Sequence, residues 1–188
     1  MDGYRLAAAS DCEAIRAIYA PYIEKTAVSF ETEVPAHEAF LARMTGIIGT
    51  YPYLVYTRGG EVLGYAYGSA YHERSAYRYS ADLSIYLRED SHGQGIGRGL
   101  YTRLMALLRE QGIRNVYAAL WAANEESRRF HLALGFREVG VFENAGYKLG
   151  QWHGVLWLEK QLLPYDVPPE PFKRFDELPA ELIRKFLL

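Results

Sequence analysis

The sequence is poor in cysteine and in long apolar runs, and each shortage excludes a class of protein. Cys12 is the single cysteine, so no internal disulfide is expected, and a reducing cytoplasm suits the chain better than export. No apolar run approaches the roughly 18 residues of a membrane span, and the first residues do not resemble a signal peptide. We therefore expect a cytoplasmic protein without a membrane partner.

Excess charge and metal-ligand spacing are also missing. The formal net charge is −2, which argues against the basic surface that nucleic-acid binding requires. The chain has five histidines, His37, His72, His92, His131 and His153. None of them stands beside cysteines or paired carboxylates at a spacing typical of a metal site. We expect neither a nucleic-acid partner nor a bound metal.

The chain has ample material for a globular core. Its 188 residues are 49% hydrophobic and 23% charged, which are ordinary values for a folded domain. Surface scaling allows a chain of this size to bury roughly 70% of its surface, enough for one core without disulfides or metals. With about 150 residues per domain, we expect one domain and an extension.

Two hydrophobic periods alternate along the chain and predict its secondary structure. A first helix is expected after a capping box at Ser10 and Glu13, and a second begins with Pro35 in its first turn. A third helix is expected to begin in segment 93–99 and to end at about residue 111, and a fourth spans residues 124–134. Strands are expected over residues 4–7, 53–57, 61–71, 77–87, 113–121, 136–142 and 152–159. The order βααβββαβαββ indicates an α/β (α+β) domain with a mixed central sheet.

The tail differs in composition from the rest of the chain. Four prolines between residues 164 and 171 predict a stiff, extended stretch, and residues 178–187 predict a short amphipathic helix. We therefore divide the chain into a domain over residues 1–163 and an extension over residues 164–188. The extension either packs on its own domain or serves as a dimer arm or a cover over a neighbour's site.

The clearest chemical signal is the glycine-rich segment over residues 92–100, which follows a predicted strand and opens a helix. Glycines let a ligand approach the backbone, and the free N–H groups at a helix start favour an anion such as phosphate. A P-loop needs Gly-Lys-Ser/Thr, which is absent at Gly97, and the dinucleotide pattern lacks its last glycine. A diphosphate loop for coenzyme A remains, beside the alternative of a glycine-rich turn without a ligand.

Further residues give the segment a family resemblance. Gly95 and Gly97, then Asn124, then His131, then Gly135-Phe136 resemble the motif of the GNAT acyl-CoA N-acetyltransferases, although His92 stands where the family has Arg or Gln. The resemblance implies acetyl-CoA as cosubstrate. It places the cofactor-binding residues at Ile85, Tyr86, Leu87, His92, Gly93, Gln94, Gly95, Ile96, Gly97, Arg98, Gly99, Asn124 and Ser127.

Residues 4–160 resemble a narrower family, the phosphinothricin and methionine sulfoximine N-acetyltransferases. Segment 26–32, with its sequence Thr-Ala-Val-Ser-Phe-Glu-Thr, carries this resemblance together with segments 64–67, 74–77, 84–87 and 146–148. It implies a homodimer that acetylates the amino group of a small amino acid or analogue. Another acceptor, such as a peptide N-terminus or a polyamine, and a non-catalytic acyl-CoA-binding module are the alternatives.

The resemblance also assigns chemical roles. Asp82 aligns with a family glutamate that acts as general base, directly or through water, and His131 aligns with the proton donor for the leaving thiolate. A backbone N–H near Tyr86 is expected to polarise the thioester carbonyl. From the residues alone, Asp82 is equally a solvated or ion-paired strand residue, His131 a packed helix residue, and Asn124 a helix cap.

The acceptor needs its own set of residues. Its carboxylate requires a cation, and Arg74 is the aligned candidate because its planar fork suits bidentate binding. Phe30, Glu31 and Tyr77 are expected to form the pocket wall, and His153 aligns with a family Trp-His pair.

Overall fold

The computed structural model describes residues 2–188. The strands are β1 (Gly3–Leu6), β2 (Tyr53–Arg58), β3 (Glu61–Ala70), β4 (Ser80–Leu87), β5 (Asn115–Trp121), β6 (Arg137–Lys148) and β7 (Gln151–Gln161). The helices are α1 (Cys12–Glu24), α2 (His37–Ile47), α3 (Ile96–Glu110), α4 (Glu125–Ala133) and α5 (Ala180–Leu187). Up to β7 their order is the predicted βααβββαβαββ.

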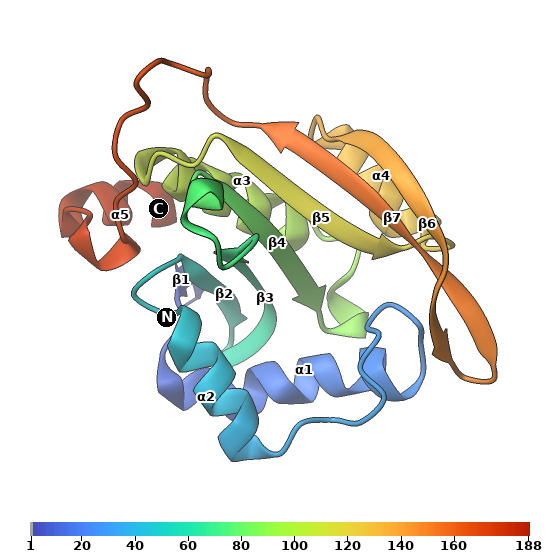
Figure 1. Ribbon diagram of the computed structural model, residues 1–188. Helices are drawn as coiled ribbons and strands as arrows, with labels where there is room; N and C mark the ends of the chain where they lie inside the picture. Colours follow the sequence, from blue (N-terminus) through green and yellow to red (C-terminus); the bar gives the residue numbers. More distant parts are fainter. Residues whose placement is uncertain (1) are drawn as a thin grey trace.

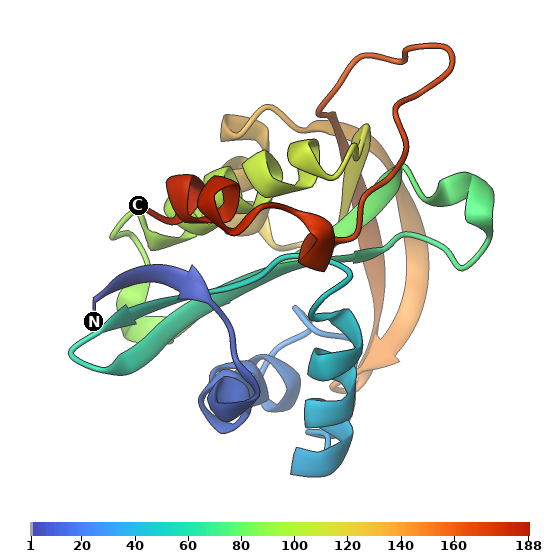
Figure 2. The ribbon, with the colours of Figure 1, turned by 90° about the vertical axis from the view of Figure 1, so that its left-hand side faces the viewer.

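One mixed sheet organises the molecule. Its strand order is β1-β2-β3-β4-β5-β7-β6, and among the described pairs only β4 and β5 run parallel. Helix α3 makes the crossover between these two strands. Helices α1 and α2 cover one face, and α3, α4 and α5 cover the other (Figures 1 and 2). No helix in residues 2–188 has both the length and the apolar character to cross a membrane.

Each face of the sheet has its own core. On the α3 side, Leu100, Leu104 and Leu107 recur at helical spacing and are fully buried in one cluster with strand residues such as Leu54. On the other side, Ile15 and its neighbours on α1 pack against the tyrosines of β2 and β3. The sheet is therefore buried on both faces at its centre, which fixes β4 between two packed layers.

The start of α1 corrects a prediction. The capping box at Ser10 and Glu13 is wrong, because a 3₁₀ turn over Ala9–Asp11 precedes the helix. The Asp11 carboxylate accepts the Ala8 N–H at 2.8 Å and two donors of Arg5 at 2.7 Å each. This ion pair ties the helix start to β1. Pro35 also lies outside its predicted helix, since α2 begins at His37.

The last hairpin is longer than predicted. The segment 143–146 looks like a turn in sequence, yet β6 continues through it to Lys148. A bulge between Phe142 and Gly146 absorbs these residues, and Asn144 takes a positive φ of 51°. The hairpin of β6 and β7 therefore extends beyond the sheet beside the loop that joins α1 and α2 (Figure 1).

Strands β4 and β5 separate part-way along their length. They pair from Ser80 to Asp82 on β4, opposite Asn115 to Tyr117 on β5. Strand β4 then continues to Leu87 and β5 to Trp121 without pairing to each other in the described residues. The main-chain N–H groups of β4 beyond Asp82 that would face β5 are thus available to a ligand, whereas the Leu87 carbonyl accepts from the Tyr22 hydroxyl.

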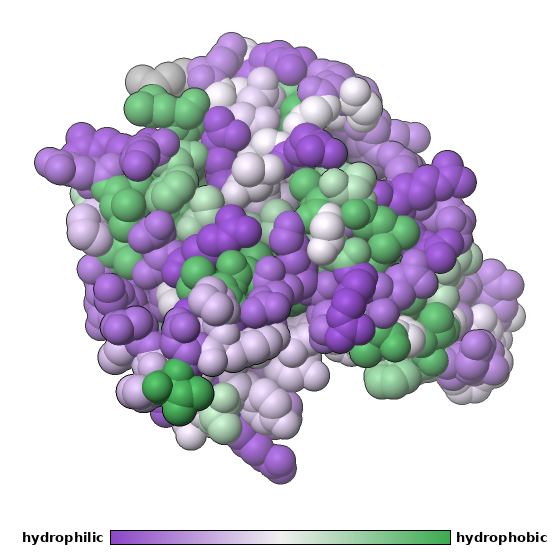
Figure 3. Space-filling view, turned by 90° about the horizontal axis from the view of Figure 1, so that it is seen from above, coloured by the Kyte–Doolittle hydropathy of each residue, from purple (hydrophilic) through white to green (hydrophobic). Residues whose placement is uncertain are grey.

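The tail packs on its own domain, as one of the two interpretations held. Phe175 and Leu178 are buried in the α3-side core. The Lys173 N–H donates to the Gln111 carbonyl at 2.9 Å, and the Phe175 N–H donates to the Thr50 carbonyl at 3.1 Å. On the face seen in Figure 3, apolar residues form separate patches among hydrophilic ones.

This packing predicts a stability effect in the tail. Replacing Phe175 by Ala should lower the free energy of unfolding by about 3 kcal/mol, because the ring leaves a cavity in the shared core. Replacing Val167 by Ala is the matched control in the same tail, since its side chain is 96% exposed. Urea unfolding measures both; an equal, small effect of the two variants would mean that the tail is not part of the core.

Candidate functional site

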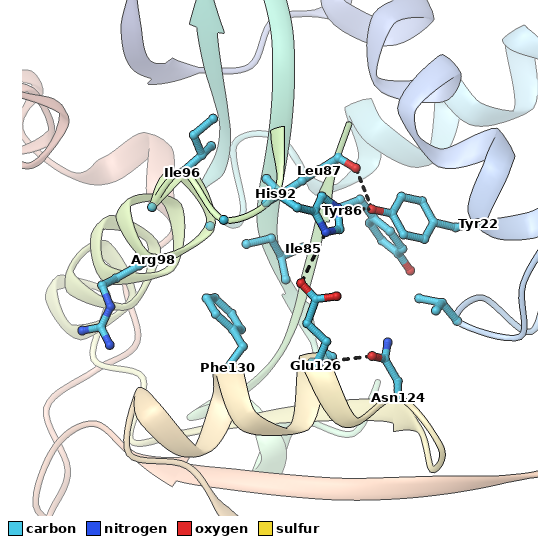
Figure 4. A pocket seen from close by; sticks show the side chains of 15 residues that line it. Tyr22, Ile85, Tyr86, Leu87, His92, Ile96, Arg98, Asn124, Glu126 and Phe130 are labelled. Atoms are coloured by element: carbon cyan, nitrogen blue, oxygen red, sulfur yellow. Dashed lines mark hydrogen bonds and ion pairs between the residues drawn. The ribbon is translucent and has the colours of Figure 1, made fainter. Parts of the chain in front are cut away.

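A cavity of about 320 Å³ opens where β4 parts from β5 (Figure 4). It lies between the end of β4, the start of α3, the start of α4 and the end of α1. Its lining residues are Tyr22, Val28, Ile85, Tyr86, Leu87, His92, Gly93, Gly95, Ile96, Gly97, Arg98, Asn124, Glu126, Ser127 and Phe130. Eleven of the thirteen residues predicted to bind the cofactor are in this set, and the two exceptions are Gln94 and Gly99.

The turn before α3 adopts a backbone that favours glycine. Gly93 has a φ of +73° and Gly95 a φ of +79°, and a side chain at either position would be strained. Gly95 is the N-cap of α3 in this left-handed conformation. The positive φ angles turn the main chain so that it borders the cavity without a Cβ atom.

The first turn of α3 presents unpaired N–H groups. Its first backbone bond runs from the Gly99 N–H to the Gly95 carbonyl at 3.0 Å, so the N–H groups of residues 96–98 have no helix carbonyl to bind. Arg98 adds a positive charge at the same end of the cavity. The helix dipole, these N–H groups and Arg98 together favour an anion, and a diphosphate fits that chemistry.

Two contacts cross the cavity. The Tyr22 hydroxyl donates to the Leu87 carbonyl at 2.6 Å and lies 3.0 Å from Nε2 of His92. Nδ1 of His92 lies 3.5 Å from the carboxylate of Glu126 on α4 (Figure 4). His92 is thus held between α1 and α4 at the edge of the cavity. A ligand that enters between the glycine turn and α4 meets this histidine.

Asn124 caps α4, as one interpretation of its position held. Its Oδ1 accepts the Ser127 N–H at 3.0 Å. Both residues also line the cavity, and Phe130 from the next turn forms an apolar wall opposite Gly97. The cap therefore fixes the edge of α4 that borders the cavity.

Gln94 and Gly99 are the two residues of the predicted cofactor set that do not line the cavity, so their contact with the cofactor stays a prediction. Oε1 of Gln94 accepts from Arg58 at 2.8 Å and its Nε2 donates to the Asp90 carbonyl at 2.9 Å, so the side chain is turned away from the cavity. A Cβ atom at Gly99 would lie 1.9 Å from the Tyr4 hydroxyl. Gly99 is therefore required by the packing of Tyr4 and contributes nothing to the cavity.

His131 is also placed differently from its predicted role. It is 1% exposed, packs against Tyr101, Phe130 and Phe136, and does not line the cavity. Its Nδ1 lies 2.8 Å from the Ser127 carbonyl and its Nε2 lies 3.2 Å from the Tyr101 hydroxyl. Burial lowers the pKa of His131, which favours the neutral ring. The geometry fits a packed core histidine, and the role of proton donor has no support from it.

Asp82 is a carboxylate in a dry environment. It stands at the last paired position of β4 before the two strands separate, opposite Tyr117. Its Oδ1 is buried and has no hydrogen-bond partner within residues 2–188. Burial raises the pKa of Asp82 to about 7, because the charged form loses hydration. A carboxyl group with this pKa takes up and releases protons near neutral pH.

The loop between α1 and α2 forms the end of the cavity that lies away from the glycine turn. Val28 lines the cavity there, beside Tyr86. Phe30 lies against Gly146 and 6.3 Å from the ring of His153, while Glu31 binds Arg43 and accepts from Tyr19. His153 of β7 is buried. None of Phe30, Glu31 and His153 is among the residues that line the cavity, so their role toward an acceptor stays a prediction.

Arg74 and Tyr77 lie elsewhere. Both are exposed in the segment between β3 and β4, and neither lines the cavity. The Tyr77 ring packs against Tyr71, whose ring lies 4.5 Å from that of Tyr117, the residue opposite Asp82. These contacts place the segment at the Asp82 end of β4. Their role toward an acceptor stays a prediction.

Four lining residues were missing from the predicted set: Tyr22, Val28, Glu126 and Phe130. Tyr22 follows the apolar spacing of α1 and is indistinguishable in sequence from a core residue. Val28 and Glu126 lie inside segments that already carried the resemblance, which was the available signal for them. Phe130 gave no signal, because its orientation depends on how α4 packs.

A known protein family matches most of this chain. The family model described as an acetyltransferase (GNAT) domain matches residues 4–157. The chain belongs to the GNAT acetyltransferase family. The resemblance predicted from the glycine-rich segment is thereby confirmed, and so is the predicted fold class.

Three proteins with this kind of activity in their names are similar to the chain over most of its length. A phosphinothricin N-acetyltransferase from Streptomyces viridochromogenes is 34% identical over 170 residues, which cover 90% of this chain and 92% of the relative. An L-methionine sulfoximine/L-methionine sulfone acetyltransferase from Salmonella typhimurium is 30% identical, with 87% and 96% covered. The crystal structure of a phosphinothricin acetyltransferase from Sinorhizobium meliloti, in complex with AcCoA, has a TM-score of 0.85 and 32% identity, covering 95% of this chain and 98% of that one.

Proposed function

We propose that this GNAT family member transfers an acetyl group from acetyl-CoA to the amino group of a small amino acid or analogue of the phosphinothricin or methionine sulfoximine type. The observation that carries the proposal is the cavity itself. It joins the unpaired N–H groups of the first turn of α3 to the part of β4 that no longer pairs with β5. Asp82, whose pKa is raised to about 7, does not line the cavity but stands on β4 three residues before Ile85, which does.

The glycine turn supports the binding of the diphosphate of acetyl-CoA. The N–H groups of Ile96, Gly97 and Arg98 have no helix carbonyl to bind and belong to residues that line this part of the cavity, and the Arg98 side chain adds charge. The pantetheine arm then runs between β4 and α4, along Ile85, Phe130 and the Asn124 amide. This orientation brings the thioester to the separated part of β4, where free main-chain N–H groups are suited to polarise its carbonyl.

Asp82 supports the proton transfer. An amino group near pH 7 is mostly protonated and must lose a proton before its nitrogen attacks the thioester carbon. Asp82 stands three residues before Ile85, about 10 Å along the strand, so we assign it the proton through bridging water molecules. The new N–C bond forms as the C–S bond breaks, and the attacking nitrogen then releases its second proton to solvent to become the amide N–H. CoA leaves as the thiolate, which takes a proton from solvent.

The acceptor side supports a small polar substrate. Phe30, Glu31 and His153 lie outside the lining of the cavity, on the loop that carries Val28 and on β7, and we propose them as the wall of an acceptor site that adjoins it. Arg74 is our proposed partner for an acceptor carboxylate, as an exposed cation in the segment that leads into β4. Tyr77 lies in the same segment and is proposed to shape its surface.

We also propose a homodimer that acts in the cytoplasm. The β6–β7 hairpin carries exposed apolar side chains that a second copy would cover: Val139, Val141, Phe142, Tyr147, Leu149 and Trp152. The single thiol, Cys12, is free and buried, which suits a reducing compartment. Light scattering of the purified protein measures its mass, and a monomer at all concentrations would contradict the dimer.

An acetylation screen tests the proposed function. The purified chain is incubated with acetyl-CoA and a panel of free amino acids, phosphinothricin, methionine sulfoximine, a peptide and a polyamine, and the released thiol is measured. We expect turnover with the amino acid analogues. Preference for the peptide or the polyamine would replace the acceptor class, and binding of acetyl-CoA without turnover of any amine would favour a non-catalytic binding module.

A further inference from the structure

A buried lysine joins the last hairpin to the loop between α1 and α2. Lys148, at the end of β6, is 6% exposed. Its Nζ donates to the main-chain carbonyl of Ser29 at 2.5 Å, across 119 residues of sequence. The Lys148 carbonyl in turn lies 3.0 Å from Nε2 of His153. A charged side chain is rarely buried to this extent unless its position matters to the structure or the site.

The carbonyl held by Lys148 belongs to a hydrogen-bonded network. The Ser29 hydroxyl lies 2.6 Å from the Tyr19 hydroxyl and accepts the Glu31 N–H at 3.2 Å. Tyr19 also donates to the Glu31 carboxylate at 3.2 Å, and Arg43 of α2 pairs with the same carboxylate. Lys148 therefore supplies the contact from the hairpin side, while α1 and α2 hold the loop from the other side.

A second contact presses the loop and the hairpin together. A Cβ atom at Gly146 would lie 2.5 Å from Cδ2 of Phe30, so the ring lies directly on the main chain of β6. Phe30 and Glu31 follow the Ser29 carbonyl that Lys148 binds, and Val28, which lines the cavity, precedes it. A shift of the Ser29 carbonyl would therefore move all three of these side chains.

The contact between Lys148 and Ser29 lies next to Val28, a residue that lines the cavity. The glycine turn lies at one end, and Val28 marks the other, where the acceptor must reach the thioester. Burial lowers the pKa of Lys148 while the charge of Glu31 opposes that change, so the ammonium is retained beside a carboxylate. Without the Lys148 ammonium, Arg43 would be the cation that pairs with the Glu31 carboxylate.

We infer that Lys148 is a positioning residue for the acceptor: its ammonium clamps the Ser29 carbonyl and so holds Phe30 and Glu31 in the wall of the acceptor site. The inference rests on the proposed function for the identity of that site. The clamp itself is a property of the folded chain. It predicts that loss of the ammonium affects the acceptor and leaves the binding of acetyl-CoA unchanged.

Replacement of Lys148 by Met tests the clamp, with Lys160→Met as the matched control. Lys160 on β7 also donates from Nζ to a main-chain carbonyl, that of Leu134, away from the loop. In Lys148→Met we expect the KM for the acceptor to rise at least tenfold and the KM for acetyl-CoA to stay within twofold. Lys160→Met should leave both KM values within twofold. Lys148→Arg, which keeps a cationic donor, should restore most of the acceptor KM.

Hydrogen exchange of segment 26–34 gives a readout that does not depend on turnover. We expect exchange there to quicken at least tenfold in Lys148→Met and to stay unchanged in Lys160→Met. If Lys148→Met does not fold, Gly146→Ala displaces Phe30 from the same strand and should raise the acceptor KM alone. Unchanged exchange, an unchanged acceptor KM, or an equal rise of both KM values would overturn the inference. A chain that acetylates no amine while the exchange rates change as expected would overturn the proposed function and leave the clamp standing.

Discussion

Replacing Asp82 by Asn should lower kcat/KM for the amine at least 100-fold near pH 8. The amide keeps the size of the side chain but cannot accept a proton, and a well-placed general base contributes about 10²- to 10⁴-fold to the rate. The buried, unpaired Oδ1 and the separated strands beside it are the features that set Asp82 apart from the other carboxylates. Steady-state assays with thiol release as the readout measure the effect.

The pH profile makes the Asp82 prediction sharper. Burial raises the pKa of Asp82 to about 7, so below that pH the group is protonated and cannot act as a base. In the wild type, kcat/KM should therefore rise with pH up to about 7 and level off above it as far as this group is concerned. The rise should disappear in Asp82→Asn. Asp176→Asn is the control, because Arg174 lowers the pKa of that exposed carboxyl; a profile with the same rise in Asp82→Asn would remove the base role.

Replacing Gly97 by Val should weaken the binding of acetyl-CoA about 100-fold, or about 2.7 kcal/mol. A Cβ atom at Gly97 would already lie 3.4 Å from Leu87, 3.5 Å from Ile85 and 3.5 Å from Phe130, which are cavity residues. The two further methyl groups of valine would fill the space that the pantetheine arm needs. Titration calorimetry measures the dissociation constant of acetyl-CoA and of CoA.

The control for Gly97→Val is Gly46→Val. Gly46 lies within α2, where an added Cβ atom meets nothing within 4 Å. Gly46→Val therefore makes the same glycine-to-valine change within a helix without placing atoms in the cavity. We expect its affinity for acetyl-CoA to match the wild type. Equal affinity of Gly97→Val and Gly46→Val, with both variants folded, would mean that the coenzyme does not pass between α3 and β4.

The fold was predictable because its signals are local. The hydrophobic period changes between helices and strands, and the order of eleven elements follows from it without any knowledge of packing. The errors lie where a distant partner decides. The turn before α1 is held by the Asp11 carboxylate, which binds the Ala8 N–H and the distant Arg5. Strand β6 continues past Phe142 because β7 pairs with it across a bulge.

The site could be predicted where main-chain groups, rather than side chains, border the cavity. The glycines at positions 93 and 95 indicate a turn with positive φ, and that turn lines the cavity. Side-chain direction is a different matter, because neighbours in sequence point to different sides of a helix. Gly99 faces Tyr4, and His131 faces the core although it follows Phe130, which faces the cavity.

The amide nitrogens of the glycine turn offer the most direct test of how this protein holds its cosubstrate. Backbone ¹H–¹⁵N spectra recorded during titration with CoA should show the resonances of Gly93, Gly95, Ile96 and Gly97 moving most, and saturating together at the dissociation constant that calorimetry gives. Strong movement elsewhere while these four resonances stay in place, in a protein that still turns over acetyl-CoA, would contradict a diphosphate bound at the start of α3.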